Sequence, residues 1–223
     1  MRLSSLATLL AFTLVGCSGT PPQSTSSSSG GSSSSSGGSS GSSDASASSS
    51  SSSGGVDAGP QKRTVFIASN FAVDGAYFGT DPAAAGLGPR NFASVLCNNT
   101  ANGAKLAGTY EAWVSGPGPD IQPIDTTVDW YLPDGKTLVL KAGSPTTTLL
   151  HAIDQNAKGE ANTSQFVWTG LGAAGAAAPN CNGWSATTAM GTTGNPTATD
   201  STWTSDKQIS CGRLAAFYCF QRR

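Results

Sequence analysis

The sequence predicts an α+β domain over residues 62–223, and three observations favour this class. Short runs of β-branched and aromatic residues alternate with turn signals, as expected for the strands of a sheet. One segment, residues 91–106, instead has apolar residues at helical spacing. All five Trp, all four Tyr and seven of the eight Phe lie in this block of about 160 residues, which is long enough to bury a sizeable core.

The first expected elements are a strand and a helix. Residues 64–68 predict the strand, because they are rich in β-branched side chains. Residues 91–106 predict the helix, with Cys97 on or beside it. The apolar residues at helical spacing are Phe92, Val95, Leu96, Ala101 and Leu106. Gly108 is expected to end this helix.

A second strand is expected at residues 109–114, because polarity alternates along it. Its two faces would carry Tyr110, Ala112 and Val114 on one side and Glu111 and Trp113 on the other. Such alternation is typical of a strand that buries one face and leaves the other less covered.

The remaining patterns predict a hairpin and two short strands. In residues 130–140, Pro133-Asp134-Gly135 supplies turn chemistry between two apolar runs. Apolar strands are expected at residues 166–170 and 215–220. The stretch between these strands, about 40 residues rich in Gly, Ala, Thr and Asn, is too long for an ordinary connection. It is expected to be a structured functional loop or to hang on a disulfide framework.

The start of the chain has the pattern of an export signal. Arg2 supplies a positive charge, and residues 6–15 form an apolar run shorter than the roughly 20 residues that cross a bilayer. The run ends in Leu14-Val15-Gly16-Cys17, which resembles the lipobox of bacterial lipoproteins. That resemblance implies a signal peptide over residues 1–17, with Cys17 lipidated and becoming the mature N-terminus. An ordinary secretory signal with a chance cysteine is the alternative.

Lipoprotein sorting and the next segment suggest how the domain is displayed. Ser18 follows the cysteine where an inner-membrane retention signal has Asp, so the resemblance implies the outer membrane of a double-membraned bacterium. Residues 18–61 are almost entirely Ser and Gly and contain no aromatic residue. Such a segment predicts a disordered linker with a reach of roughly 35 Å. The domain would lie in the periplasm or on the cell surface.

The charge balance and the cysteines of the domain exclude some partners and predict disulfides. Eleven Lys and Arg balance eleven Asp and Glu in residues 62–223, so no nucleic-acid partner is expected. Cys97, Cys181, Cys211 and Cys219 are an even set in an exported chain and predict two disulfides. Four cysteines allow three pairings, and spacing alone does not choose among them. The domain has one His, so no zinc site is expected.

These residues resemble a C-type-lectin-like domain across nearly all of residues 62–223. In that fold a helix carries the first cysteine, a Trp-x-Gly-Leu strand precedes a long loop, and three more cysteines close it. The corresponding residues here are Cys97, Trp168-Thr169-Gly170-Leu171, Cys181, Cys211 and Cys219. Within the superfamily the chain is similar to the endostatin domain of collagens and to bacterial lipoproteins of unassigned function.

The resemblance implies specific structural features. It implies a mainly antiparallel sheet, one or two helices, a long Gly-rich loop and nested disulfides that join Cys97 to Cys219 and Cys181 to Cys211. Sugar-binding members hold Ca²⁺ with Glu-Pro-Asn or Gln-Pro-Asp in the long loop and with Asn-Asp after a tryptophan. Here the loop has Ala178-Pro179-Asn180, and a single acidic residue, Asp206, follows Trp203. No cofactor is therefore expected, with Ca²⁺ the one alternative, through Asp200 and Asp206 joined by Asp154 or Glu160.

Catalysis has little support in the residue pattern. His151 is the only His, and no nucleophile motif lies near it. Asp125 and Asp129 are a carboxylate pair of the kind used for acid–base chemistry, but such pairs also occur in ordinary loops. We therefore expect that the domain is not an enzyme.

The favoured interpretation is a binding or adhesion module for an extracellular protein or a glycan. Its candidate ligand contacts are Trp184, Trp203 and Asp206, in or beside the long loop, because tryptophan is favoured at binding hot spots. The alternative for both indoles is a place in the core. A structural envelope protein without a small ligand is the alternative function. Oligomeric state does not follow from the sequence.

Overall fold

The computed structural model of this chain describes residues 61–116 and 123–222. The expected signal peptide with Cys17, and the expected linker up to residue 60, lie outside the described residues. Within the described part, no helix combines the length and the apolar character needed to cross a membrane.

Eight strands, three α-helices and four 3-10 helices are found in the described residues. The strands are β1 (Lys62–Ile67), β2 (Tyr110–Ala112), β3 (Asp129–Tyr131), β4 (Leu138–Leu140), β5 (Val167–Trp168), β6 (Met190–Gly194), β7 (Lys207–Ser210) and β8 (Ala216–Gln221). The helices are α1 (Tyr77–Thr80), α2 (Pro89–Gly103), α3 (Cys181–Trp184), η1 (Ser69–Phe71), η2 (Pro82–Ala84), η3 (Ala173–Gly175) and η4 (Ser201–Trp203). The α+β class is confirmed, but one or two helices were too few, because α1 and α3 are single turns of four residues.

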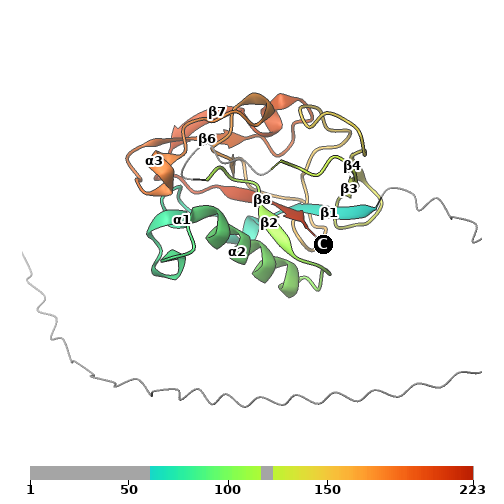
Figure 1. The fold of residues 1–223 in the computed structure, drawn as a ribbon, viewed down its shortest axis with the longest axis horizontal. Coiled ribbons are helices and arrows are strands. Elements are labelled where there is room, and N and C mark those ends of the chain that lie inside the picture. Colours follow the sequence, from blue (N-terminus) through green and yellow to red (C-terminus); the bar gives the residue numbers. More distant parts are fainter. Residues whose placement is uncertain (1–60, 117–122, 223) are drawn as a thin grey trace, which may run out of the picture. The chain divides into compact units, whose positions relative to one another are not determined.

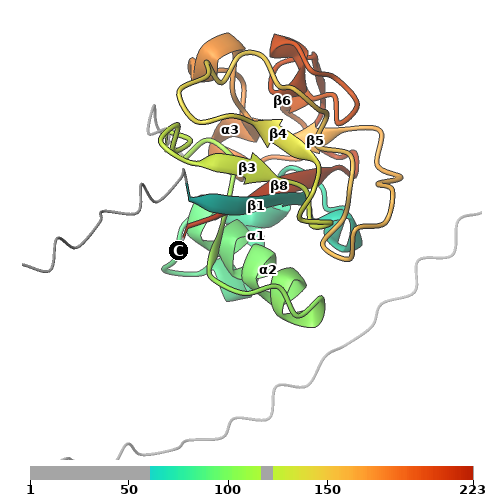
Figure 2. The ribbon, with the colours of Figure 1, turned by 90° about the vertical axis from the view of Figure 1, so that its right-hand side faces the viewer.

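The strands form a mostly antiparallel sheet around β8. Their hydrogen-bonded order is β4-β3-β1-β8-β5-β6-β7, and β2 also pairs with β8. Two pairs are parallel, β1 with β3 and β5 with β8, and the other five are antiparallel. Figure 1 and Figure 2 show α1 and α2 on one side of β1 and β8. Helix α3 packs against α1 through Trp184 and Phe78.

The central strands are buried on both faces. Along β8, Phe217 and Cys219 enter the core cluster under α2, while Tyr218 and Phe220 enter a second cluster on the opposite face. Along β1, Phe66 belongs to the first cluster, whereas Val65 and Ile67 belong to the second. A strand that is buried on both faces has a continuous run of apolar residues. This is why β1 and β8 were recognisable in the sequence.

Helix α2 confirms the expected helix with two differences. Cys97 lies within it and is fully buried, and Pro89 occupies its first turn, where a missing N–H costs nothing. Val95 is 42% exposed, so it does not belong to the buried stripe. The helix ends at Gly103 rather than at Gly108.

The end of α2 is a Schellman motif. The Leu106 N–H donates to the Ala101 carbonyl (2.9 Å) and the Lys105 N–H donates to the Asn102 carbonyl (3.0 Å). Lys105 has φ 61°, a conformation that glycine adopts more easily. Leu106 packs against the core, and this contact accompanies the turn. Sequence reasoning missed the stop because the left-handed residue of this motif is Lys105 rather than a glycine.

The other strand predictions hold in position and alternation. Tyr110, Ala112 and Val114 are buried, whereas Glu111 and Trp113 are half-buried. Strands β3 and β4 form the expected hairpin. The long stretch before β8 is structured, because it contains α3 and the antiparallel pair β6 and β7.

The two disulfides have the nested pairing implied by the resemblance. Cys97 in α2 joins Cys219 in β8, and Cys181 in α3 joins Cys211 just after β7, each with a Cα–Cα distance of 5.6 Å. All four cysteines are fully buried. The first bridge ties the helix to the central strand, and the second closes the long stretch on itself.

Helix α3 is a left-handed turn. Its four residues, Cys181, Asn182, Gly183 and Trp184, have φ values of 59°, 54°, 69° and 64°. A left-handed conformation costs roughly 1–2 kcal/mol for each residue with a side chain. The turn is fixed by the disulfide at its first residue and by Trp184, whose buried indole N–H donates to the Ser115 carbonyl (2.8 Å). Tertiary contacts therefore impose this backbone.

Candidate ligand-binding cleft

The structure buries the two tryptophans that the sequence offered as ligand contacts. Trp184 is fully buried and Trp203 is 1% exposed, so neither ring forms a contact surface in this structure. They also lie in different core clusters, Trp184 on the α2 side of the sheet and Trp203 on the opposite side. The expectation of a shared surface is therefore corrected, and the alternative, a place in the core, describes both residues.

Each buried indole packs against other aromatic rings and donates its N–H to a backbone carbonyl. Trp184 packs edge-on against Phe78, with ring centroids 5.3 Å apart. The Trp203 N–H donates to the Thr146 carbonyl (2.9 Å), and the Trp203 carbonyl accepts the Tyr218 hydroxyl (2.9 Å). Burial of that hydroxyl raises the pKa of Tyr218 well above its usual value, so it stays a neutral donor.

The third candidate contact, Asp206, is half-buried. Its carboxylate pairs with the ammonium of Lys207 (3.0 Å) and its N–H donates to the Thr193 carbonyl (2.8 Å). These contacts fix the start of β7. Neither involves the Trp184 or Trp203 ring.

A different tryptophan, Trp113, lines a cleft on the opposite side of the sheet from α2. It is half-buried, and the N–H of its backbone donates to the Tyr218 carbonyl (2.9 Å), which extends the pairing of β2 with β8. Alternation along β2 directs its indole away from α2, onto Trp203 and Phe220. The Trp113 and Trp203 rings stack with centroids 6.2 Å apart and an interplanar angle of 23°.

The cleft beside Trp113 has a volume of about 410 Å³, within the usual range for small-molecule sites. Its described lining residues supply aromatic, aliphatic and hydroxyl groups, and none of them is charged. The lining residues are Trp113, Pro123, Ile124, Thr126, Thr146, Thr147, Gly175, Trp203 and Thr204. Segments far apart in the sequence meet here, so no single stretch of the chain encodes the cleft.

Several polar groups of the cleft have no partner within the described residues. The Trp113 indole nitrogen is buried and forms no hydrogen bond there. The residues Thr126, Thr146 and Thr147 are half-buried, and their hydroxyls have no hydrogen bond in the part of the chain that the structure describes. Buried donors without partners are rare in proteins, and they are satisfied by a ligand, an ion or water.

A second, smaller cavity of about 20 Å³ adjoins the cleft through Trp113, Pro123 and Ile124, which line both. Such a volume is close to that of one water molecule. Its apolar surface comes from Ala112, Trp130 and Phe220. The cleft therefore has a wide, hydroxyl-rich part and a narrow, mostly apolar part.

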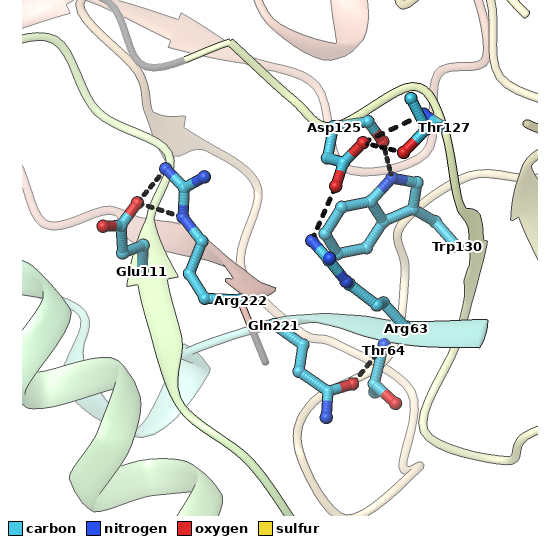
Figure 3. A network of polar contacts seen from close by, with 8 residues as sticks. All are labelled: Arg63, Thr64, Glu111, Asp125, Thr127, Trp130, Gln221 and Arg222. Atoms are coloured by element: carbon cyan, nitrogen blue, oxygen red, sulfur yellow. Dashed lines mark hydrogen bonds and ion pairs between the residues drawn. The ribbon is translucent and has the colours of Figure 1, made fainter. Parts of the chain in front are cut away.

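Glu111, Asp125 and Arg222 also line the narrow part. With Arg63 they form the two ion pairs drawn in Figure 3. Arg222 contacts Glu111 through Nε and a terminal nitrogen, and both contacts use the same carboxylate oxygen, Oε2. Arg63 pairs with Asp125 (3.0 Å), whose backbone carbonyl accepts the Trp130 indole N–H (2.8 Å). Both cavity carboxylates are therefore neutralised by an arginine.

The pKa of Asp125 depends mainly on Thr127, two residues further along the chain. The Thr127 hydroxyl (2.6 Å) and Thr127 N–H (2.9 Å) donate to its carboxylate, and together with Arg63 they hold the pKa of Asp125 below its usual value. Asp125 is thus an ionised acceptor at neutral pH and has no proton to donate as a general acid.

The other residues considered for catalysis or metal binding do not line the Trp113 cleft. His151 is exposed, with Nδ1 2.8 Å from the Ala152 carbonyl. Asp129 accepts the Ala142 N–H and Asp200 accepts the N–H and hydroxyl of Thr202. In the described residues, no group of three or more His, Cys, Asp and Glu side chains is placed to hold a metal ion.

Sequence reasoning missed the cleft, although one signal for it was present. Alternation in residues 109–114 assigned Trp113 to the face opposite the buried Tyr110, and all four other tryptophans are at most 1% exposed. Trp113 is thus the one partly exposed indole. Comparison with known proteins adds no candidate, since neither a protein-family model nor a curated protein matches this chain.

Proposed function

We propose that the chain is a lipid-anchored outer-membrane protein that presents a C-type-lectin-like domain as a binding or adhesion module. In this proposal Cys17 carries the lipid, residues 18–61 are the tether, and the Trp113 cleft receives the ligand. The observation that carries the binding role is the cleft of about 410 Å³, which has no charged side chain among its described lining residues. One of those residues, Trp113, also has a buried indole N–H that lacks a partner in the described residues.

The lectin-like fold is supported by connectivity. Helix α2 carries the first cysteine, β5 carries the tryptophan of Trp168-Thr169-Gly170-Leu171, and the nested disulfides have the pairing of that family. Since similar folds host unrelated functions, this likeness favours an architecture, and the cleft is what favours binding.

The anchor is tested by lipid labelling. Cells that express the full chain are grown with radiolabelled palmitate, and we expect label in the wild-type chain and none in Cys17→Ser. Fractionation then locates the labelled chain. Equal labelling of both chains, or none in either, overturns the lipoprotein assignment.

The binding role is tested with the full-length chain in a detergent without a sugar headgroup. Fluorescently labelled chain is titrated onto intact cells and purified envelope fractions, and we expect saturable binding that Trp113→Ala abolishes and the matched surface change Thr148→Val leaves intact. Thr148 is exposed and does not line the cleft. Absence of saturable binding by the wild-type chain would favour the structural envelope role instead.

A further inference from the structure

Strand β7 is an open edge of the sheet. It is the last strand in the hydrogen-bonded order, beyond β6, and no other strand of the described residues pairs with its outer side. Figure 1 shows β7 at the margin of the sheet, next to β6. Lys207, Gln208 and Ser210 are exposed, whereas Ile209 is buried in the core. Open edges present N–H and C=O groups that another strand can bind.

The register of β6 and β7 identifies which groups are free. Gln208 lies opposite Thr192. The Thr192 N–H donates to the Pro179 carbonyl (2.7 Å) and the Thr192 carbonyl accepts the Gly170 N–H (3.0 Å), so neither group is directed at β7. Directly opposed residues of an antiparallel pair either exchange both main-chain bonds or both face away from each other. The N–H and C=O of Gln208 therefore face outward, and so does the Ser210 N–H two residues further on.

Two β7 edges fit each other when they run antiparallel with Gln208 opposite Gln208. Each Gln208 N–H then donates to the Gln208 carbonyl of the other copy. Ser210 lies opposite Asp206 of the other copy, and its N–H meets the Asp206 carbonyl, which accepts no hydrogen bond within the described residues. The reverse bond is not needed, because the Asp206 N–H donates to the Thr193 carbonyl (2.8 Å). The Ser210 carbonyl likewise already accepts the Arg213 N–H (3.0 Å).

The charge of the edge permits this contact. Lysine side chains commonly prevent edge strands from pairing with other chains. Lys207 is the one charged residue of β7, and its ammonium pairs with the Asp206 carboxylate (3.0 Å), so this edge has no net charge. The Gln208 amides of two copies would lie side by side across the pair, where each amide has a donor for the acceptor of the other.

We propose that two copies of this chain associate edge to edge through β7, antiparallel and centred on Gln208. The inference is independent of the ligand-binding role, since no β7 residue lines the Trp113 cleft. A contact between two strands of four residues is small beside the roughly 1,000 Å² of a stable interface, so we expect weak, concentration-dependent association. Anchoring of the copies in one membrane would raise their local concentration and favour the dimer.

Cysteine cross-linking tests the register. Residues directly opposite in a hydrogen-bonded pair have Cα atoms about 5.5 Å apart, within the range of a disulfide. The full-length chain with Gln208→Cys, concentrated in detergent, should therefore form a covalent dimer on mild oxidation. Ser210→Cys is the matched control and should stay monomeric, because the two Ser210 positions would be about 13 Å apart along the pair. Non-reducing electrophoresis distinguishes the two results.

Sedimentation velocity tests the contact without a cross-link. The wild-type chain in detergent should show a monomer–dimer equilibrium as its concentration rises. Gln208→Pro removes the outward N–H, which β6 does not use, and should weaken association at least roughly tenfold. Gln208→Lys places like charges opposite each other and should weaken association several-fold. Asn99→Lys adds the same charge at an exposed position of α2 and should leave the association unchanged.

The outcomes decide the inference separately from the proposed function. A wild-type chain that stays monomeric at every concentration, or equal cross-linking of Gln208→Cys and Ser210→Cys, overturns the β7 dimer. A dimer that survives both Gln208→Pro and Gln208→Lys also overturns it. Circular dichroism and the melting temperature establish that each variant is folded, and Gln208→Lys decides the matter if Gln208→Pro unfolds. Failure here leaves the lipid anchor and the cleft unaffected, because their tests use other residues.

Discussion

Gly194 in β6 lies directly against the backbone of Trp203. A Cβ placed on Gly194 would be 1.8 Å from the Trp203 carbonyl oxygen and 2.7 Å from its carbonyl carbon. The same oxygen accepts the Tyr218 hydroxyl. The absence of a side chain at Gly194 therefore allows η4 to close over the sheet and places Trp203 beneath the Trp113 ring.

This contact predicts that Gly194→Ala is strongly destabilising. The added methyl must displace backbone rather than a flexible side chain, so we expect the free energy of unfolding to fall by about 3 kcal/mol or more. Urea denaturation measures it. The matched control is Gly103→Ala at the end of α2, where a Cβ would meet nothing within 4 Å, and it should be neutral or slightly stabilising. Equal effects of the two substitutions would contradict the close approach.

The left-handed turn predicts opposite effects of two substitutions at Asn182. Asn182→Ala should lower the free energy of unfolding by about 1 kcal/mol, because alanine tolerates φ 54° less well than asparagine. Asn182→Gly should raise it by a few tenths of a kcal/mol, since glycine adopts this conformation without a Cβ penalty.

Urea denaturation again gives both values. Asn99→Ala is the matched control, because Asn99 is an exposed residue of α2 and alanine is a better helix former. A loss of stability at Asn99 as large as at Asn182 would mean that the turn is not the cause.

The disulfide between Cys181 and Cys211 predicts local rather than global loosening when it is removed. The double variant Cys181→Ser/Cys211→Ser should lose about 3–4 kcal/mol, the chain-entropy value for a sequence separation of 30 residues. Limited proteolysis should then cut between residues 182 and 210, including β6 and β7. Strands β1 and β8 should stay protected, because both of their faces are buried and the other disulfide is intact.

The reciprocal variant tests this assignment. Cys97→Ser/Cys219→Ser separates α2 from β8, so its new cleavage sites should fall in and around residues 89–109. Identical cleavage maps for the two double variants would contradict the assignment of each disulfide to a different segment.

Burial of the tryptophans predicts a single indole accessible to solutes. Trp113 is half-buried and the other four indoles are at most 1% exposed, so iodide should quench a minor part of the emission. Trp113→Phe should remove most of the quenchable part. Trp184→Phe should leave the quenchable part unchanged. Strong quenching that persists in Trp113→Phe would mean that a second indole is open to solvent.

The turn of the β3–β4 hairpin predicts an acid-dependent loss of stability. The Thr137 hydroxyl (2.6 Å) and N–H (2.9 Å) donate to the Asp134 carboxylate and lower the pKa of Asp134 to about 2. Because the folded state favours the ionised form, this contribution is present above the ordinary aspartate pKa near 3.8 and is lost as the pH falls towards 2.

Thr137→Val should therefore raise the Asp134 pKa and weaken the fall of the melting temperature with acidification between about pH 4 and about pH 2. NMR titration and thermal melts measure the two effects. Thr148→Val, which has no carboxylate partner in the described residues, is the control. An unchanged Asp134 titration in Thr137→Val would contradict the hydroxyl as the main cause.

Much of the fold was predictable because its signals are local. The β-branched run of β1, the alternation of β2, the Pro133-Asp134-Gly135 turn and the helical spacing of α2 each depend on residues within one or two turns of chain. The end of α2 was not predictable in this way. The left-handed residue that follows the helix is Lys105 rather than a glycine, and the packing of Leu106 accompanies it. The disulfide pairing followed from resemblance and not from spacing.

The sequence by itself determined the class of the fold, the positions of most elements and the even set of cysteines. Only the tertiary structure decided which tryptophans meet solvent. Trp203 contacts Thr146, 57 residues away, Trp184 contacts Ser115, 69 residues away, and the backbone of Trp113 contacts Tyr218. Burial is a property of such long-range packing, so a cleft assembled from five separate segments left one partial signal in the sequence, the alternation that sets Trp113 apart from Tyr110.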